Sequence, residues 1–194
     1  MNTIRMTLAA AAAVLFLAPT ASFAQKTIER AFVSGGTVDL DLSAGDYDIV
    51  ASRDNRIRIT LTERGRDNPD AYVDVTVKGS RATIETDGPM NDGLGVRIEL
   101  PRLTNIVLRL SAGDLKVSGI EGSKDVSARA GDVSIAVGPR EQYRHVNASI
   151  RIGDLNADAF DVRKEGFFRS FEWTGKGQYD LRAHLTVGDL KLTR

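Results

Sequence analysis

The chain has 194 residues and carries 26 Lys or Arg and 26 Asp or Glu. This balance argues against nucleic-acid binding, which needs a clustered basic surface. The sequence contains no Cys, which excludes disulfides, a thiol nucleophile, thiolate metal sites and the lipid-anchored Cys of a lipoprotein.

The first 24 residues, MNTIRMTLAAAAAVLFLAPTASFA, have the pattern of a secretory signal peptide. A single charge, Arg5, precedes an apolar run at 8–18, a break at Pro19 and small residues at Ser22 and Ala24. Cleavage is expected after Ala24. The apolar run is too short to span a bilayer, and no later run is long enough. We therefore expect a periplasmic or secreted protein without a membrane span.

The remaining residues, 25–194, are enough for one domain with a sizeable core. Apolar residues alternate with polar ones, which is typical of strands with one buried face. The alternation covers the stretches 38–42, 57–61, 73–77, 96–100, 106–110, 126–128 and 179–185. No stretch keeps a helical period over ten residues. The sequence therefore predicts an all-β domain.

A Gly-Asp pair interrupts the alternation five times. The five segments are LDLSAGDYDIV (40–50), LRLSAGDLKVS (108–118), SARAGDVSIAV (127–137), SIRIGDLNADA (149–159) and HLTVGDLKL (184–192). An apolar or small residue precedes each Gly, and we expect it to face inward: Ala44, Ala112, Ala130, Ile152 and Val187. The residues one and three places after each Asp are also expected inside: Tyr47 and Ile49, Leu115 and Val117, Val133 and Ile135, Leu155 and Ala157, Leu190 and Leu192.

The two residues of each pair predict a sharp corner. Glycine adopts positive φ without the cost of roughly 1–2 kcal/mol that other residues incur. Aspartate accepts a backbone N–H that the bend removes from the sheet. The corner residues are Gly45, Asp46, Gly113, Asp114, Gly131, Asp132, Gly153, Asp154, Gly188 and Asp189.

Two architectures use such corners. Gly-Asp makes a two-residue hairpin turn, which gives an antiparallel meander or sandwich. Alternatively, each pair marks one corner of successive coils in a β-solenoid, with like residues stacked about 4.8 Å apart. The corner glycines are 68, 18, 22 and 35 residues apart. Gaps of 18 and 22 fit one coil, and gaps of 68 and 35 allow about three and two coils with degenerate corners, although a meander permits the same gaps.

The run GVRIELPRLTNIVLRLSAGDLKVSGIEGSKDVSARAGDVSI, 95–135, resembles a bacterial extracytoplasmic family of adhesin-like domains of unknown function, also called toast-rack domains. WTGKGQYDLRAHLTVGDLKL, 173–192, is similar to the closing segment of that family. The resemblance implies a single-stranded right-handed β-helix and carries no established activity. The chain departs from the pattern between 46 and 112, where the loops RGRDNPD and TDGPMNDGLG intervene.

The segment KEGFFRSFEWTGKGQYD, 164–180, is rich in aromatic residues. These five side chains are candidates for a binding platform: Phe167, Phe168, Phe171, Trp173 and Tyr179. The alternative, which we favour, is that 164–194 forms the C-terminal cap and last coil, covering core and edge groups that would otherwise be exposed.

No catalytic residue, cofactor site or metal site is predicted. Each corner offers one carboxylate, whereas calcium needs several oxygens. The chain lacks G-x-S-x-G, S-x-x-K and H-E-x-x-H. His145 and His184 lack ligand spacing and are expected to be ordinary strand residues.

We therefore expect a non-enzymatic, adhesin-like module of the cell envelope that contacts a protein or a glycan. The exposed strand residues near the corners are mixed in character: Lys116, Ser118, Ser134, Asn156 and Lys191. The competing hypothesis is a carbohydrate-active lyase or glycosidase on a β-helical scaffold, in which paired carboxylates act on a polysaccharide. The partner and the oligomeric state do not follow from the sequence.

Overall fold

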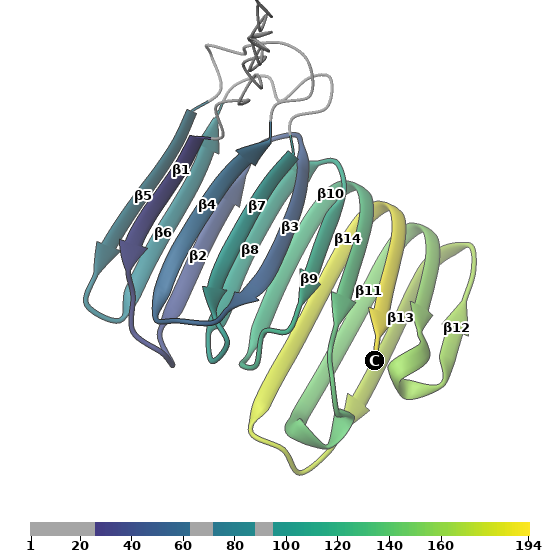
Figure 1. Cartoon of the computed structure of the whole chain (residues 1–194). Coiled ribbons are helices and arrows are strands. Elements are labelled where there is room, and N and C mark those ends of the chain that lie inside the picture. The colour runs from purple at the N-terminus through teal and green to yellow at the C-terminus, as the bar shows by residue number, and fades with distance from the viewer. Residues whose placement is uncertain (1–25, 63–71, 88–94) are drawn as a thin grey trace, which may run out of the picture.

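The computed structural model describes residues 26–62, 72–87 and 95–194 (Figure 1). The predicted signal peptide, 1–24, lies outside these residues. The strands are β1 (Lys26–Ala31), β2 (Thr37–Leu42), β3 (Asp46–Ser52), β4 (Arg56–Thr62), β5 (Tyr72–Lys78), β6 (Arg81–Asp87), β7 (Gly95–Pro101), β8 (Asn105–Ala112), β9 (Leu115–Ser118), β10 (Lys124–Ala136), β11 (Tyr143–Ala157), β12 (Val162–Lys164), β13 (Phe167–Thr174) and β14 (Tyr179–Thr193). Two short 3-10 helices, η1 (Arg140–Gln142) and η2 (Asp158–Phe160), join β10 to β11 and β11 to β12.

The domain is all-β, as its period-two alternation predicts. In β2, for example, Val38, Leu40 and Leu42 are buried, whereas Asp39 and Asp41 point away from the core. Side chains from all the long strands form one apolar core. No helix in the part of the chain that the structure describes is long and apolar enough to cross a membrane.

The strands form two walls around this core. The upstream wall contains the strand segments that precede a corner, in the order β5, β6, β2, β8, then the first halves of β10, β14 and β11, then β13. The downstream wall contains β1, β4, β7, β3, β9, the second halves of β10, β14 and β11, and β12. Figure 1 shows the strands of both walls running side by side along the stack.

A layer is defined here as one upstream segment, its corner and the downstream segment that follows. Neighbouring layers pair in parallel in both walls. The corners therefore lie above one another, with Gly131 paired to Gly188 and Gly188 to Gly153. Backbone hydrogen bonds connect the remaining corners to this column. Gly113 N–H donates to Ala130 O (3.1 Å), and Gly45 N–H donates to Ala112 O (3.0 Å). The five corners share one column.

The layers do not follow one another in chain order. Along the stack the order is β6–β7, β2–β3, β8–β9, β10, β14 and β11. The gap of 68 residues between Gly45 and Gly113 is therefore one step of the column, and the intervening residues build a layer on the other side of β2–β3. Our assignment of three coils to this gap and two to the gap of 35 was wrong. Spacing along the chain does not reveal which side of a layer the next one joins.

Two details of the corners also differ from expectation. Ala44 is exposed, Ala112 and Ala130 are half-buried, and Ile152 and Val187 are 42% and 43% exposed, so the residues before Gly do not face the core. The apolar residues after Asp are all buried, as predicted.

The glycine backbone follows the prediction in four corners. Gly113, Gly131, Gly153 and Gly188 have φ between 108° and 131°. Gly45, the outermost corner of the column, is not among the positive-φ residues of the described chain.

Antiparallel strands close both ends of the stack. β1 and β4 extend the downstream wall and β5 extends the upstream wall at one end, and β12 and β13 flank β11 at the other. Arg58 on β4 ties its end together through Glu29 (2.7 Å), Glu99 (2.8 Å) and Asp54 (3.0 Å). Hydrogen bonding to Arg58 lowers the pKa of Glu29.

Candidate interaction surface

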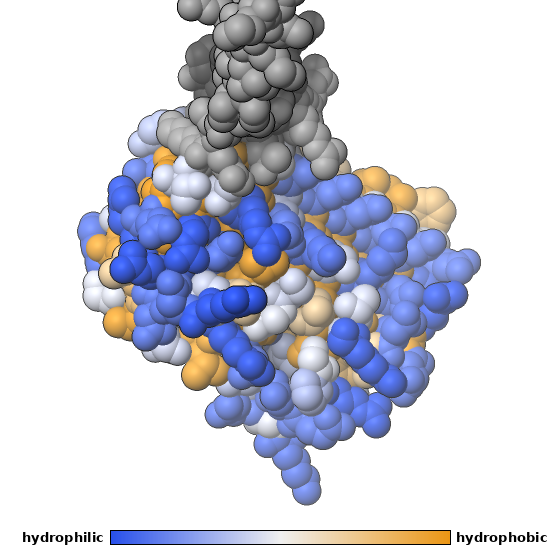
Figure 2. All heavy atoms as spheres, in the orientation of Figure 1, coloured by the Kyte–Doolittle hydropathy of each residue, from blue (hydrophilic) through white to orange (hydrophobic). Residues whose placement is uncertain are grey.

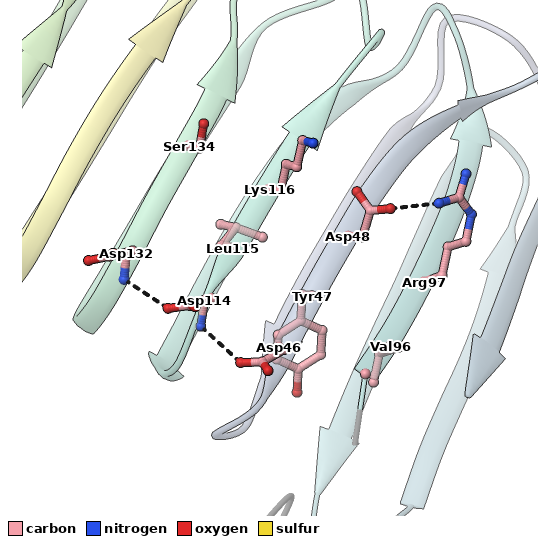
Figure 3. Close-up of a pocket in the computed structure, with 11 residues that line it drawn as sticks. Asp46, Tyr47, Asp48, Val96, Arg97, Asp114, Leu115, Lys116, Asp132 and Ser134 are labelled. Atoms are coloured by element: carbon pink, nitrogen blue, oxygen red, sulfur yellow. Dashed lines mark hydrogen bonds and ion pairs between the residues drawn. The ribbon is translucent and has the colours of Figure 1, made fainter. Parts of the chain in front are cut away.

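The corner aspartates form a ladder of carboxylates along the stack. Asp46 Oδ1 accepts the backbone N–H of Asp114 (3.4 Å), and Asp114 Oδ1 accepts that of Asp132 (3.4 Å). Asp132 Oδ1 in turn accepts the N–H of Asp189 (3.3 Å), and Asp154 pairs in register with Asp189. Figure 3 shows the first two of these bonds. Asp46, Asp114 and Asp132 thus each cap a donor in the neighbouring layer and keep a second oxygen for other contacts.

A second row runs beside the ladder, two residues further along each strand. Lys116 pairs with Asp48 on one side and Ser134 on the other, and Ser134 pairs with Lys191. Asn156 pairs with Lys191 and extends the row into β11. Four of the five residues that we singled out near the corners therefore meet in one line, but only Lys116 and Lys191 are exposed, whereas Ser134 and Asn156 are half-buried. Ser118, the fifth, lies two residues beyond Lys116 on the same strand, opposite Val50.

Opposite charges meet across the row. Arg97 Nη1 lies 2.6 Å from Asp48 Oδ2, and Arg97 Nε lies 3.6 Å from Glu99 Oε1. At the other end, Lys191 Nζ lies 3.8 Å from Asp189 Oδ2. Since these side chains are partly exposed, both signs of charge are available to a partner.

A shallow groove of about 500 Å³ crosses β7, β3, β9 and β10 at this place (Figure 3). Its polar lining comes from the ladder and the adjacent row: Asp46, Asp48, Arg97, Asp114, Lys116, Asp132 and Ser134. The Tyr47 ring, by contrast, is 2% exposed and belongs to the core. The groove can therefore offer charged and hydrogen-bonding groups, but no aromatic face. Figure 2 shows a mostly hydrophilic surface on the side of the molecule that it presents.

A buried polar cluster replaces the ladder where the Gly-Asp motif is missing. Thr86, at the end of β6, accepts the N–H of Ser43 (2.9 Å) and lies 2.9 Å from the Tyr47 hydroxyl. Tyr47 also donates to Ser43 O (3.2 Å), and burial raises the pKa of this tyrosine. Sequence reasoning missed this cluster, because Thr86 and Ser43 are 43 residues apart and share no motif.

The structure separates the five aromatic residues of 164–180. Phe171 is buried and Trp173 is half-buried, and their rings lie 5.3 Å from that of Phe160, where they close the end of the core. Tyr179 packs edge-on against Tyr143 inside the stack, at 6.2 Å.

The other two aromatic residues are exposed. Phe167 and Phe168 are 66% and 77% exposed, at the corner side of the same end. Phe168 has φ 52°, a conformation that is unusual for a bulky residue and a sign of local strain. Phe167 pairs with Ile152, which pairs with Val187, so an apolar strip crosses three strands.

Sequence reasoning also missed a lysine in the core. Lys124 is 2% exposed, and its Nζ donates to the Tyr143 hydroxyl (2.9 Å) and to Gly122 O (3.1 Å). Tyr143 donates to Val137 O (3.1 Å). Burial lowers the pKa of Lys124 to about 8 and raises the pKa of Tyr143. In the sequence, the burial of Lys124 is indicated by its place at an inward-facing position in the alternation of its strand.

The two histidines lie on the outer face of the upstream wall. His145 Nδ1 is 3.2 Å from Asp180 Oδ1, and His184 Nδ1 is 2.9 Å from the Ser149 hydroxyl. Across residues 26–62, 72–87 and 95–194, no group of three His, Cys, Asp or Glu side chains is arranged to hold a metal ion.

No family model matches the chain, and no curated protein matches its sequence. A solved structure from Clostridium sporogenes, of a candidate cell adhesion protein, superposes with a TM-score of 0.53 at 15% identity, over 87% of this chain and 99% of that one. A candidate adhesin from Bacteroides fragilis matches over 88% of this chain and 97% of that one, at 11% identity and a TM-score of 0.31. The first similarity supports a shared all-β fold.

Proposed function

We propose that this chain is an exported, non-enzymatic β-solenoid of the adhesin-like, toast-rack type that binds a protein or a glycan in the cell envelope. The observation that carries the proposal is the pairing of the carboxylate ladder with the row of Lys116, Ser134, Lys191 and Asn156. The layers repeat these groups about every 4.8 Å, so they face an extended partner at regular intervals. An open groove without an enclosed pocket suits adhesion better than turnover.

The proposal assigns two roles to the carboxylates and the cations of this surface. Asp46, Asp114 and Asp132 each accept a backbone N–H with one carboxylate oxygen and present the other oxygen to hydrogen-bond donors of the partner. The exposed lysines, Lys116 and Lys191, contact acidic groups of the partner. Complementary charge mainly governs specificity and association rate, so binding should weaken with salt.

Charge reversal of the row tests this proposal. The protein carrying Lys116→Glu and Lys191→Glu is compared with wild type for binding to immobilised envelope polysaccharides and surface proteins. The control carries the same charge change on the upstream wall, Arg109→Glu with Arg182→Glu, both at exposed positions.

We expect the row variant to lose at least tenfold in affinity and the control to bind like wild type. If all three proteins bind equally well, the row does not take part in binding the partner. Turnover of an envelope polysaccharide, abolished by replacing one carboxylate, would favour the carbohydrate-active enzyme instead.

A further inference from the structure

The last strand of the chain is not the last strand of the stack. β14 lies between β10 and β11 and runs parallel to both, in register over nearly its whole length (Figure 1). Five of its side chains are buried in the core: Leu181, Ala183, Leu185, Leu190 and Leu192. The chain thus builds β11 first and then returns to fill the position that β11 left open.

Two features link β10 directly to β11, on either side of β14. The connection at 137–142, which includes η1, carries the chain from β10 past one strand position to β11. Inside the core, Lys124 on β10 reaches Tyr143 on β11 and bonds to its hydroxyl (2.9 Å). Two strand spacings amount to about 9.6 Å, a distance that the long lysine side chain can bridge. This link between β10 and β11 explains why a lysine is buried in the core at position 124.

A short segment links β14 to β13. This segment, 175–178 (Gly-Lys-Gly-Gln), crosses the start of β11 and is held by backbone bonds from Gly175 to Arg144 O (2.8 Å) and from Gly177 to Tyr143 O (3.0 Å). At the other end of β14, Val137 N–H donates to Thr193 O (2.9 Å), and Arg194 Nη2 lies 3.3 Å from Asp161 Oδ1. These contacts and the strand pairing must break for β14 to leave, and they form again when a strand enters.

The position between β10 and β11 also selects the sequence that fills it. A Cβ on Gly188 would overlap Gly131 O, and one on Gly153 would overlap Gly188 O. A strand that enters must have glycine at this point and apolar residues in alternation on both sides. Residues 179–193 meet both requirements.

We infer that β10 and β11 form an acceptor slot and that the β14 strand of a second copy of this chain can occupy it, giving an exchanged dimer. Each slot in such a dimer holds the same contacts as in the monomer, so the exchange costs little beyond the change at 175–178 and the entropy of association. The Gly188 contact disfavours an unrelated strand, which is why the partner is a second copy.

The absence of cysteine from the sequence allows a direct test by disulfide trapping. Asn147 on β11 and Arg182 on β14 are exposed register partners, and neighbouring strands place Cα atoms within disulfide reach. One protein carries Asn147→Cys and a second carries Arg182→Cys. The two are unfolded in urea, refolded together at increasing concentration and oxidised. A non-reducing gel then measures the disulfide between the two proteins.

We expect this disulfide to increase with protein concentration during refolding and to stay rare when the two folded proteins are mixed. A mixture of Lys116→Cys with Arg182→Cys reports random collision, since these residues lie on different walls. A single chain carrying both Asn147→Cys and Arg182→Cys should close internally, which verifies the geometry. If the double variant closes but the mixed proteins never exceed the collision level, the slot does not accept a second copy.

Discussion

The carbonyl oxygen of Gly113 occupies the space that a Cβ on Gly131 would need. The same overlap recurs between Gly188 and Gly131, and between Gly153 and Gly188. The corners are therefore in backbone contact along the column, and four of their glycines, Gly113, Gly131, Gly153 and Gly188, satisfy two demands at once, a positive φ and the absence of a side chain.

A pair of alanine substitutions separates these two demands. Gly138 also has a positive φ (69°), but nothing lies within 4 Å of a Cβ placed there. We expect Gly138→Ala to lower the free energy of unfolding by about 1 kcal/mol, the cost of the backbone conformation alone. Gly131→Ala should lower it by about 3 kcal/mol or more, because the neighbouring layer must also shift. Urea unfolding followed by circular dichroism measures both, and equal losses would show that the close stacking does not matter.

The carboxylate ladder predicts opposite outcomes for two replacements of Asp114. Alanine removes the acceptor for the N–H of Asp132, and we expect a loss of about 1 kcal/mol in the free energy of unfolding. Asparagine keeps an acceptor oxygen and removes one of several stacked like charges, so Asp114→Asn should be as stable as wild type or slightly more stable. Any advantage of asparagine should shrink in high salt. If the asparagine variant is as unstable as the alanine one, the ladder is not held by these oxygens.

Lys124 predicts a rise in stability with pH. Burial holds its pKa at about 8 in the folded protein, below its ordinary value of 10.5. Between these values the unfolded chain binds more protons, so the free energy of unfolding increases with pH, by at most about 3 kcal/mol over the full window. Tyr143 acts in the opposite direction above pH 10, since its pKa is raised in the folded state. The effect of Lys124 on the free energy of unfolding should therefore be measured between pH 7 and pH 9.5.

The variant Lys124→Met should lack this rise. At pH 7 we expect it to be about 1–3 kcal/mol more stable than wild type, because a buried charge is replaced by an apolar chain of similar length and Tyr143 keeps its bond to Val137 O. The two unfolding curves should approach each other as the pH increases to 9.5. Parallel pH profiles would mean that Lys124 keeps its ordinary pKa in the folded protein.

At the end of the stack that holds β12 and β13, the buried aromatic residue should matter for stability and the exposed one for binding. Phe171→Ala should lower the free energy of unfolding by about 3 kcal/mol, since the ring is 9% exposed and packs on Phe160. Phe168→Gly should leave it unchanged or raise it by up to about 1 kcal/mol, because glycine accepts φ 52° without strain. Thermal unfolding and partner binding are measured on the same samples. Binding lost only in Phe168→Gly would identify the exposed ring as part of a platform, and binding retained there would assign this end to capping alone.

How much of this molecule follows from sequence is clear from particular residues. The alternation through Val38, Leu40 and Leu42 was sufficient to predict a strand with one buried face, because side chains alternate across any extended chain. The Gly-Asp pairs were sufficient to predict sharp corners, because few residues other than glycine tolerate φ near 120° and aspartate can cap a neighbouring donor, but they left open whether the corners join hairpins or stack. Both are local properties of a few consecutive residues.

Only the tertiary structure decided which layers are neighbours. The 68 residues between Gly45 and Gly113 make one step of the column, and β14 lies inside the stack although it comes last in the chain. Every layer carries nearly the same pattern of apolar residues, so local sequence cannot distinguish one neighbour from another. The choice depends on contacts between distant segments, such as Lys124 with Tyr143 and Thr86 with Ser43, whose energies exist only once the walls have formed.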